Sequence, residues 1–189
     1  MKVKKILFLG YDRTKTCLQH ILECRGCIVD HSSEKLFKND NYDLIISFGY
    51  RHIIPEELIV KCPPILNLHI SYLPFNKGAH PNFWSHYDGT PSGVSIHLID
   101  AGIDTGPILF RKKVEIDITK LTFQESYEIL FGEIERLFIQ NIEAILLNDL
   151  TPINTSEIGT YHSLSDLPTG IDWTKKINIQ LQELKEILD

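Results

Sequence analysis

The sequence predicts an α/β fold: a Rossmann-like, open, mostly parallel sheet with helices on both faces and a short C-terminal appendage. Short apolar runs alternate with stretches that carry a helical stripe of apolar residues. The run Leu44-Ile45-Ile46 has no polar alternation, which is typical of a strand buried on both faces of a parallel sheet. The 189 residues suit one domain with a sizeable core, and we divide them into residues 1–150 and a helix-bearing extension, residues 151–189.

The first half of the chain is expected to alternate strand and helix. Apolar runs that end in turn residues predict strands at residues 4–10, 27–30, 42–48 and 64–69. A helix is expected at residues 14–25, capped by Asp12 and ended by Gly26. Its apolar stripe consists of Cys17, Leu18, Ile21 and Leu22. A second, short helix is expected at residues 55–60, with Pro55 in its first turn.

The second half is expected to add a hairpin and two longer helices. Residues 81–87 favour a short helix, and residues 93–99 alternate strictly between apolar and polar. Another strand within residues 107–118 would pair antiparallel with this one around the loop at residues 100–106. Thr122 and Glu125 form a capping-box pattern at the start of a helix at residues 122–147, and a last helix is expected at residues 173–188. The stripe of the long helix is Ile129, Ile134, Leu137, Phe138, Ile142, Ile145 and Leu146.

Composition and charge argue against several classes of protein. The formal net charge is −6, and Lys and Arg do not gather in a stripe, so no nucleic-acid partner is expected. No apolar run approaches the roughly 20 residues that cross a bilayer. The apolar run after the basic start is too short for a signal peptide. We therefore expect a cytoplasmic protein without a membrane partner.

Neither a metal nor a dinucleotide cofactor is expected. Cys24 and Cys27 have C-x-x-C spacing, but the four cysteines include no second such pair for zinc, and this pair lies at a helix end. We interpret the cysteines as reduced structural thiols. The first turn, Gly10-Tyr-Asp-Arg, lacks the G-x-G-x-x-G pattern, which argues against a dinucleotide despite the Rossmann-like start.

The residues that carry chemistry gather at the end of the strand predicted at residues 64–69. Asn67 and His69 are two apart, so on a strand their side chains point the same way. Asp104 lies in the loop Gly-Ile-Asp-Thr-Gly, which could fold back onto that spot. Ligands of open α/β sheets bind beyond the carboxyl ends of the strands, where residues 48–52 also lie. An amide, a base and a carboxylate at one place favour acyl transfer.

Each of these groups has a role in acyl transfer to an amine. The Asn67 amide could stabilise the oxyanion, and His69 could take the amine proton, directly or through water. Asp104 could orient His69, raise its pKa and order a water. No Ser or Cys lies where a nucleophile is needed, which favours direct attack. In the plainer interpretation, Asn67 caps a turn and His69 is a satisfied polar residue; His97 is interpreted as structural, and Asp100 as either a loop cap or a ligand contact.

Several motifs together resemble the folate-dependent formyltransferase family. They are Asn67-Leu-His69-Ile-Ser-Tyr-Leu-Pro74, Lys77-Gly78-Ala, Gly93-Val-Ser-Ile-His and Asp100-Ala-Gly-Ile-Asp104-Thr-Gly-Pro. The resemblance covers residues 42–116 well and the start of the chain loosely. The family includes glycinamide ribonucleotide formyltransferase, methionyl-tRNA formyltransferase and the sugar N-formyltransferases. Residues 150–189 carry no motif that matches.

The resemblance implies the formyltransferase fold, a catalytic domain at residues 1–150 and N10-formyltetrahydrofolate as the formyl donor, with no metal. It assigns Asn67, His69 and Asp104 as the catalytic trio and leaves open which of them removes the amine proton. The donor is expected to lie between two loops, where it would contact Tyr50, Arg51, His52, Ile53, Ile54, Asp100 and Gly102.

The acceptor that the resemblance favours is the amine of a nucleotide-linked amino sugar. The run from Phe75 to Trp84 and the later Gly159-Thr-Tyr-His162 look most like enzymes that formylate such sugars. A UDP- or dTDP-linked 4-amino-4,6-dideoxy sugar is expected, with a pseudaminic acid precursor as one candidate. The residues expected to bind it are Tyr72, Asn76, Lys77, Gly78, His80 and Trp84.

Four other hypotheses stay open. Glycinamide ribonucleotide formyltransferase has about the right length, but its first loop is rich in Gly and Ser, unlike Gly10-Tyr-Asp-Arg. A methionyl-tRNA enzyme would carry a C-terminal β-barrel, for which too few residues follow the long helix, and the acidic charge also argues against it. A non-catalytic folate- or nucleotide-binding module and an N-formyl hydrolase with the same trio are the other two. A homodimer is compatible with the sequence.

Overall fold

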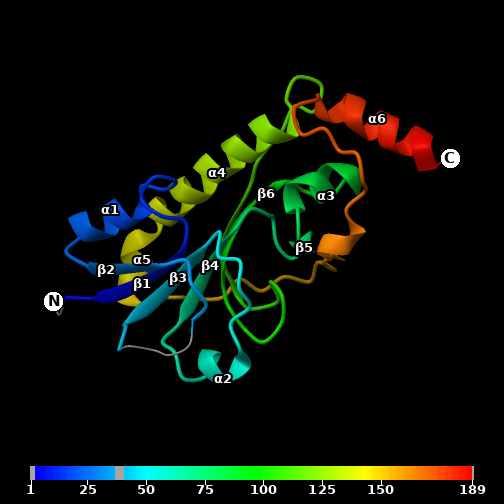
Figure 1. The fold of residues 1–189 in the computed structure, drawn as a ribbon. Helices are drawn as coiled ribbons and strands as arrows, with labels where there is room; N and C mark the ends of the chain where they lie inside the picture. Colours follow the sequence, from blue (N-terminus) through cyan, green and yellow to red (C-terminus); the bar gives the residue numbers. More distant parts are fainter. Residues whose placement is uncertain (1–2, 37–40, 189) are drawn as a thin grey trace.

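A mostly parallel sheet forms the centre of the molecule (Figure 1). The computed structural model describes residues 3–36 and 41–188. Its central strands are β1 (Lys5–Gly10), β2 (Ile28–Ser32), β3 (Leu44–Phe48), β4 (Ile65–His69), β6 (Gly93–Leu98) and β7 (Ile108–Lys113). In the described residues their order is β2-β1-β3-β4-β6-β7, and the first four are parallel neighbours. β6 runs antiparallel to β7, as the predicted hairpin requires, and it is also antiparallel to β4. The predicted fold class is confirmed.

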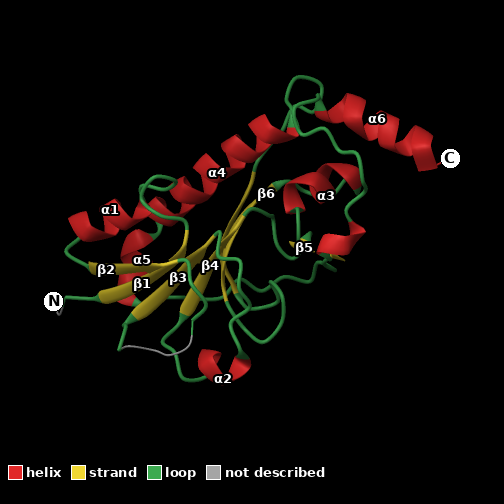
Figure 2. Cartoon of the chain, viewed as in Figure 1, coloured by secondary structure: helices red, strands yellow, loops and turns green. Residues whose placement is uncertain are grey.

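Helices lie on both faces of this sheet. They include α1 (Leu18–Cys24), α2 (Glu56–Ile59), α4 (Phe123–Gln140) and α5 (Ile142–Leu147). Ile6 and Phe8 of β1 pack in one core with α1, α4 and α5, and the alternate residues Leu7 and Leu9 pack in a second core near α2. Figure 2 shows α1 and α4 on one side of the strands and α2 on the other. Because both faces are covered, β3 is buried at every position, as its unbroken apolar run predicts.

The last part of the chain packs at one end of the molecule (Figure 1). Helix α6 (Ile177–Leu188) shares an apolar cluster with α3 (Pro81–Tyr87) and the start of α4. This cluster contains Phe83, Trp84, Phe123, Ile177, Leu181 and Leu184. The two-residue strand β8 (Tyr161–His162) pairs in parallel with β5 (Lys77–Gly78). The described part of the extension therefore contacts residues 77–78, which follow the predicted catalytic strand, while the division at residue 150 stays a prediction.

Two helix ends follow the predicted chemistry. Gly26 has φ +80°, and its N–H donates to the Glu23 carbonyl while the Cys27 N–H donates to the Leu22 carbonyl. These two bonds make a Schellman motif, which a glycine in the left-handed region allows. At the start of α4, the Thr122 hydroxyl accepts from the Glu125 N–H, and the Glu125 carboxylate accepts from the Thr122 N–H. The predicted capping box is confirmed.

Two predicted helices begin later in the structure than expected. The helix expected from residue 14 begins at Leu18, because the Asp12 carboxylate accepts from the N–H and hydroxyl of Thr14 in a turn instead of capping a helix. In the same way, the helix expected from residue 173 begins at Ile177, after a turn closed by Asp172 and Thr174.

The long helix expected at residues 122–147 is broken at Asn141. The side-chain amide of Asn141 donates to the Leu137 carbonyl, and its backbone leaves the helical region with φ −108° and ψ 8°. Ile129 was expected in the buried stripe and is 38% exposed, whereas the adjacent Leu130 is 1% exposed. The stripe is thus displaced by one residue at this point.

No helix among residues 3–36 and 41–188 combines the length and apolar character that a bilayer crossing needs.

We predict that Thr122→Ala lowers the free energy of unfolding by about 1 kcal/mol, because it removes the hydroxyl that caps α4. Urea unfolding followed by circular dichroism measures this change. Thr151→Ala, at an exposed threonine outside any helix, serves as the control and should leave the midpoint unchanged. Equal midpoints for the two variants would show that the capping box does not stabilise the protein.

Candidate active site

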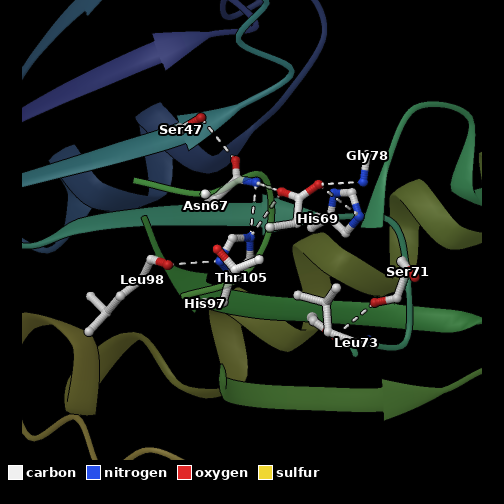
Figure 3. Close-up of polar contacts among 12 residues, drawn as sticks. Ser47, Asn67, His69, Ser71, Leu73, Gly78, His97, Leu98 and Thr105 are labelled. Atoms are coloured by element: carbon white, nitrogen blue, oxygen red, sulfur yellow. Dashed lines mark hydrogen bonds and ion pairs between the residues drawn. The ribbon is translucent and has the colours of Figure 1, made fainter. Parts of the chain in front are cut away.

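Two of the predicted catalytic residues, Asn67 and His69, lie where the sheet changes from parallel to antiparallel pairing (Figure 3). Asn67 and His69 lie at the carboxyl end of β4, and their side chains share a face of the strand as their spacing requires. Asp104 lies in the loop between β6 and β7. Its carboxylate is 3.3 Å from the Asn67 amide nitrogen and 3.6 Å from Nε2 of His69. The structure therefore brings together the three groups that the sequence analysis selected.

The Asn67 side chain is held on three sides. Its Oδ1 accepts a hydrogen bond from the Ser47 hydroxyl on the neighbouring strand β3, at 2.9 Å. Its Nδ2 lies 3.1 Å from Nε2 of His97 and 3.3 Å from Oδ1 of Asp104. With Oδ1 on the serine side, both amide hydrogens point toward the histidine and the carboxylate. The orientation of the amide is thus fixed by its neighbours.

His97 belongs to the site, although the sequence led us to interpret it as a structural residue. It lies on β6 directly opposite Asn67, and its side chain is only 2% exposed. Nδ1 of His97 donates to the Leu98 carbonyl at 2.8 Å, so Nε2 is the ring nitrogen that can accept from the Asn67 amide. The same Nε2 is 3.4 Å from Asp104. The sequence showed only the alternation of a strand, and the register between β4 and β6 was needed to find this contact.

His69 faces acceptors on its Nε2 side. Nε2 lies 3.6 Å from the Asp104 carboxylate and 3.5 Å from the backbone carbonyl of Asn76. Neither group can donate, so this nitrogen carries the hydrogen and Nδ1 keeps the lone pair. Burial lowers the pKa of His69, and the attraction of Asp104 only partly opposes that effect. The imidazole is therefore neutral at pH 7 and can accept a proton at Nδ1.

Asp104 has an uncommon backbone and a strongly held charge. Its φ is +52°, a left-handed conformation that ordinary residues rarely adopt and that concentrates at functional sites. Burial favours the protonated acid, but the attraction of His69 and the hydrogen bond from the Gly78 N–H outweigh it and lower the pKa of Asp104. The Gly78 N–H donates to Oδ2 at 2.9 Å. Asp104 is thus a carboxylate that His69, the Asn67 amide and a backbone amide hold in place.

The loop of Asp104 is braced by Asp100. The Asp100 carboxylate accepts from the Gly102 N–H at 3.0 Å and from the Thr105 hydroxyl at 2.7 Å. A Cβ at Gly102 would lie 2.0 Å from the Thr105 hydroxyl oxygen, so the turn has no room for a side chain there. Of the two interpretations given above for Asp100, the loop cap is the one these contacts support.

A cavity of about 740 Å³ opens beside the three catalytic candidates. That volume is ordinary for a site that holds a drug-sized molecule. It is lined by the loop after β3, the loop of Asp104, the start of α3, part of α4 and Trp173. Asn67, His69, His97 and Asp104 also line it. The cavity thus has room for a ligand directly beside these four side chains.

The predicted binding residues divide into two groups. All those expected to hold the donor line the cavity: Tyr50, Arg51, His52, Ile53, Ile54, Asp100 and Gly102. Of those expected to bind the acceptor, Gly78 and His80 line it. The cavity lining does not include the other four. Tyr72 stacks against Arg111, Trp84 stacks on His162, Asn76 is fully buried, and Lys77 pairs through its backbone with the segment before β8. Their predicted roles in binding have no support from the cavity.

Several lining residues were not predicted from the sequence. Tyr11 and Tyr127 form a hydrogen-bonded pair between their hydroxyls at 2.9 Å, and the Tyr11 ring occupies the space that a side chain at Gly49 would need. Trp173 stacks on His80, with ring centroids 5.6 Å apart. These residues come from distant parts of the chain, so no local pattern could have indicated them. Within the described residues, no three His, Cys, Asp or Glu side chains are arranged to hold a metal ion.

Comparison with known proteins gives one family. The sequence pattern of the family described as Formyl transferase matches residues 12–139. Methionyl-tRNA formyltransferase of Clostridium novyi (strain NT) is 35% identical over 146 residues, which cover 75% of this chain and 47% of the relative. The protein thus spans about half the length of the curated relatives it matches.

Two solved structures match over most of their length. The formyltransferase PseJ from Anoxybacillus kamchatkensis, in complex with UDP-4,6-dideoxy-4-formamido-L-AltNAc and tetrahydrofolate, is 38% identical with a TM-score of 0.83. The match covers 94% of this chain and 97% of that one. A 4-N formyltransferase from Francisella tularensis shares the fold at 24% identity, with a TM-score of 0.79 over 94% and 86% of the two chains.

We predict that the imidazole of His69 titrates below its ordinary pKa of 6.5, because burial penalises the charged ring. Asp104→Asn should lower this pKa further, since the variant removes the carboxylate that stabilises the imidazolium. Nuclear magnetic resonance of the ring protons against pH measures both shifts. Asp117→Asn, at an exposed carboxylate far along the chain, is the control and should leave His69 unchanged. A pKa above 6.5 in the unchanged protein would contradict the buried, neutral imidazole.

Proposed function

Because the protein belongs to the formyl transferase family, we propose that it transfers a formyl group from N10-formyltetrahydrofolate to the amine of a nucleotide-linked amino sugar. The observation that carries the acceptor class is the nearly full-length match, at 38% identity, to a formyltransferase whose complex contains a UDP-linked formamido sugar and tetrahydrofolate. The methionyl-tRNA enzymes match over only about half of their length.

The donor fits the cavity wall formed by residues 50–54 and the loop of Asp104. Backbone N–H and C=O groups of the first loop can pair with the pterin ring, which presents both donors and acceptors. Ile54 gives this wall a buried apolar residue, and Ile53 is 79% exposed at the rim, free to cover a bound ring. The Asp104 loop, braced by Asp100, faces it from the side of the reactive centre.

The reaction itself requires one bond to form and one to break. The acceptor amine attacks the formyl carbon, and the bond between that carbon and N10 of the folate then breaks. The amine loses a proton and N10 gains one, so the protons balance. His69 is suited to carry this proton because its ring is neutral and its Nδ1 lone pair is not turned toward Asp104 or Asn76. Asp104 stabilises the imidazolium that forms in between.

Asn67 is suited to stabilise the oxyanion of the tetrahedral intermediate. One of its hydrogens points to His97 at 3.1 Å, and the other makes a longer contact with Asp104 at 3.3 Å. The second hydrogen is the one that a formyl oxygen can take, while the contacts with His97 and Ser47 keep the amide oriented. Such a donor, fixed before the charge develops, lowers the barrier most effectively.

The acceptor sugar would lie in the part of the cavity that is lined by His80 and Trp173. The stacked pair of rings there gives a flat aromatic surface, and Gly78 allows a ligand to approach the backbone beside Asp104. We propose a UDP- or dTDP-linked 4-amino-4,6-dideoxy sugar as the substrate. The second candidate acceptor is methionyl-tRNA, because of the 35% identity to those enzymes.

We predict that Asn67→Ala lowers kcat by roughly 100- to 1000-fold, as expected when one oxyanion donor is removed. Tetrahydrofolate should still bind, because the loops that form its wall are unchanged. Stopped formylation assays and calorimetric titration with tetrahydrofolate measure the two properties separately. Asn178→Ala on α6 is the matched control and should retain the activity of the unchanged protein. Full turnover by Asn67→Ala would exclude the oxyanion role.

We further predict that, among candidate acceptors, amino-sugar nucleotides gain one formyl group when N10-formyltetrahydrofolate is supplied. Mass spectrometry of a panel that also holds glycinamide ribonucleotide and methionyl-tRNA measures the product. If only glycinamide ribonucleotide or only methionyl-tRNA is formylated, that compound is the acceptor and the amino-sugar proposal is wrong. Formate release without any acceptor would indicate a hydrolase, and folate binding without turnover would indicate a binding module.

A further inference from the structure

One buried residue, Asn76, connects the C-terminal extension to the reactive centre. It is bonded to Thr160 of the extension, and its backbone faces His69. Asn76 lies between β4 and β5 and is 0% exposed. Its backbone carbonyl is the group 3.5 Å from Nε2 of His69. Two residues later, the Gly78 N–H donates to the Asp104 carboxylate. Residues 76–78 thus contact both of the groups that would move or stabilise the proton.

The backbone of Asn76 needs support to stay where it is. Its φ is +53°, a left-handed conformation that asparagine tolerates better than most residues but that is still uncommon. The Thr160 hydroxyl supplies that support at two points. It accepts a hydrogen bond from the Asn76 N–H at 2.7 Å and donates one to the Asn76 side-chain oxygen at 3.1 Å. One hydroxyl therefore fixes both the backbone and the side chain of Asn76.

The chain around Thr160 repeats this attachment. The Thr160 carbonyl accepts from the Lys77 N–H at 3.0 Å, and the His162 carbonyl accepts from the Ala79 N–H at 2.9 Å. A Cβ on Gly78 would lie 2.2 Å from the His162 carbonyl oxygen, so the two segments are in close contact. Thr160 lies outside residues 12–139, the part that matches the family pattern. The contact to Asn76 is thus supplied by the C-terminal extension.

We propose that Thr160 is a positioning residue that sets the tautomer of His69. By holding Asn76, it keeps an obligate acceptor, the Asn76 carbonyl, against Nε2. The ring hydrogen then stays on Nε2, and Nδ1 is left to accept the amine proton. Without the hydroxyl, the Asn76 N–H loses its acceptor and only the side chain of Asn76 stays bonded, to Thr90. The Asn76 carbonyl can then turn away, which leaves the Asp104 carboxylate at 3.6 Å as the acceptor at Nε2, and a larger fraction of the ring carries its hydrogen on Nδ1. This inference rests on the proposed role of His69, although its structural half concerns the protein without substrate.

The first test measures the tautomer directly in the unchanged protein. Nitrogen-15 nuclear magnetic resonance distinguishes a protonated ring nitrogen from one with a lone pair. We expect the protonated signal at Nε2 of His69 and the lone-pair signal at Nδ1. In Thr160→Val the two signals should move toward each other, and in Thr160→Ser, which keeps the hydroxyl, they should stay apart. A hydrogen on Nδ1 in the unchanged protein overturns the proposal, whether or not any variant folds.

The second test separates positioning from folding. We expect kcat of Thr160→Val to fall roughly 10- to 100-fold, as misplaced catalytic groups do, while KM for the donor stays within about twofold. Thr160→Ser should restore most of kcat, and Thr169→Val, at an exposed threonine of the same extension, should match the unchanged protein. Unaltered kcat in Thr160→Val overturns the proposal. If the unchanged protein has the expected tautomer of His69 but transfers no formyl group, the proposed function is refuted and the role of Thr160 in setting the tautomer is not.

Discussion

The carboxylate of Asp104 is the group on which the arrangement of the site depends. It is buried, yet His69, the Asn67 amide and the Gly78 N–H surround it and keep it charged. His69 and Asn67 lie on β4 and Gly78 on β5, while His97 of β6 orients the Asn67 amide. A charge in such a place is stable only if those partners hold their positions, because a buried carboxylate that loses compensating contacts is strongly destabilising. The left-handed backbone of Asp104 and the brace supplied by Asp100 follow from the same requirement.

The change of strand direction at β4 explains why these partners meet. β4 pairs in parallel with β3, which places Ser47 beside Asn67, and antiparallel with β6, which places His97 opposite Asn67. The hairpin from β6 to β7 then returns its loop to the end of β4, and that loop carries Asp104. A fully parallel sheet would send this connection away through a long crossover. The mixed sheet is therefore what converts three separate sequence motifs into one centre.

The sequence was sufficient where chemistry is local. The spacing of Asn67 and His69, the glycine end of α1 and the capping box of α4 depend on neighbours within a few residues, and the structure has each of them. The sequence was insufficient where a contact depends on the register between two strands or on residues far apart in the chain. His97 is an ordinary polar position until β6 is paired with β4, and the contact of Thr160 with Asn76 could not be predicted because the two residues are 84 apart in the chain. The predicted helix starts at residues 14 and 173 were wrong for another reason. Asp12 and Asp172 close turns with nearby threonines, and an Asp–Thr pair can form such a turn as readily as an Asp can cap a helix.

In the proposed reaction, donor and acceptor share the cavity lined by Asn67, His69 and Asp104. A crystal structure with tetrahydrofolate and the unformylated amino-sugar nucleotide tests this most directly, because the pair cannot react. We expect the pterin against residues 50–54 and the acceptor amine within hydrogen-bond distance of Nδ1 of His69, about 2.6–3.2 Å. An amine bound out of reach of all three residues, or a folate on the wall of His80 and Trp173, would contradict it.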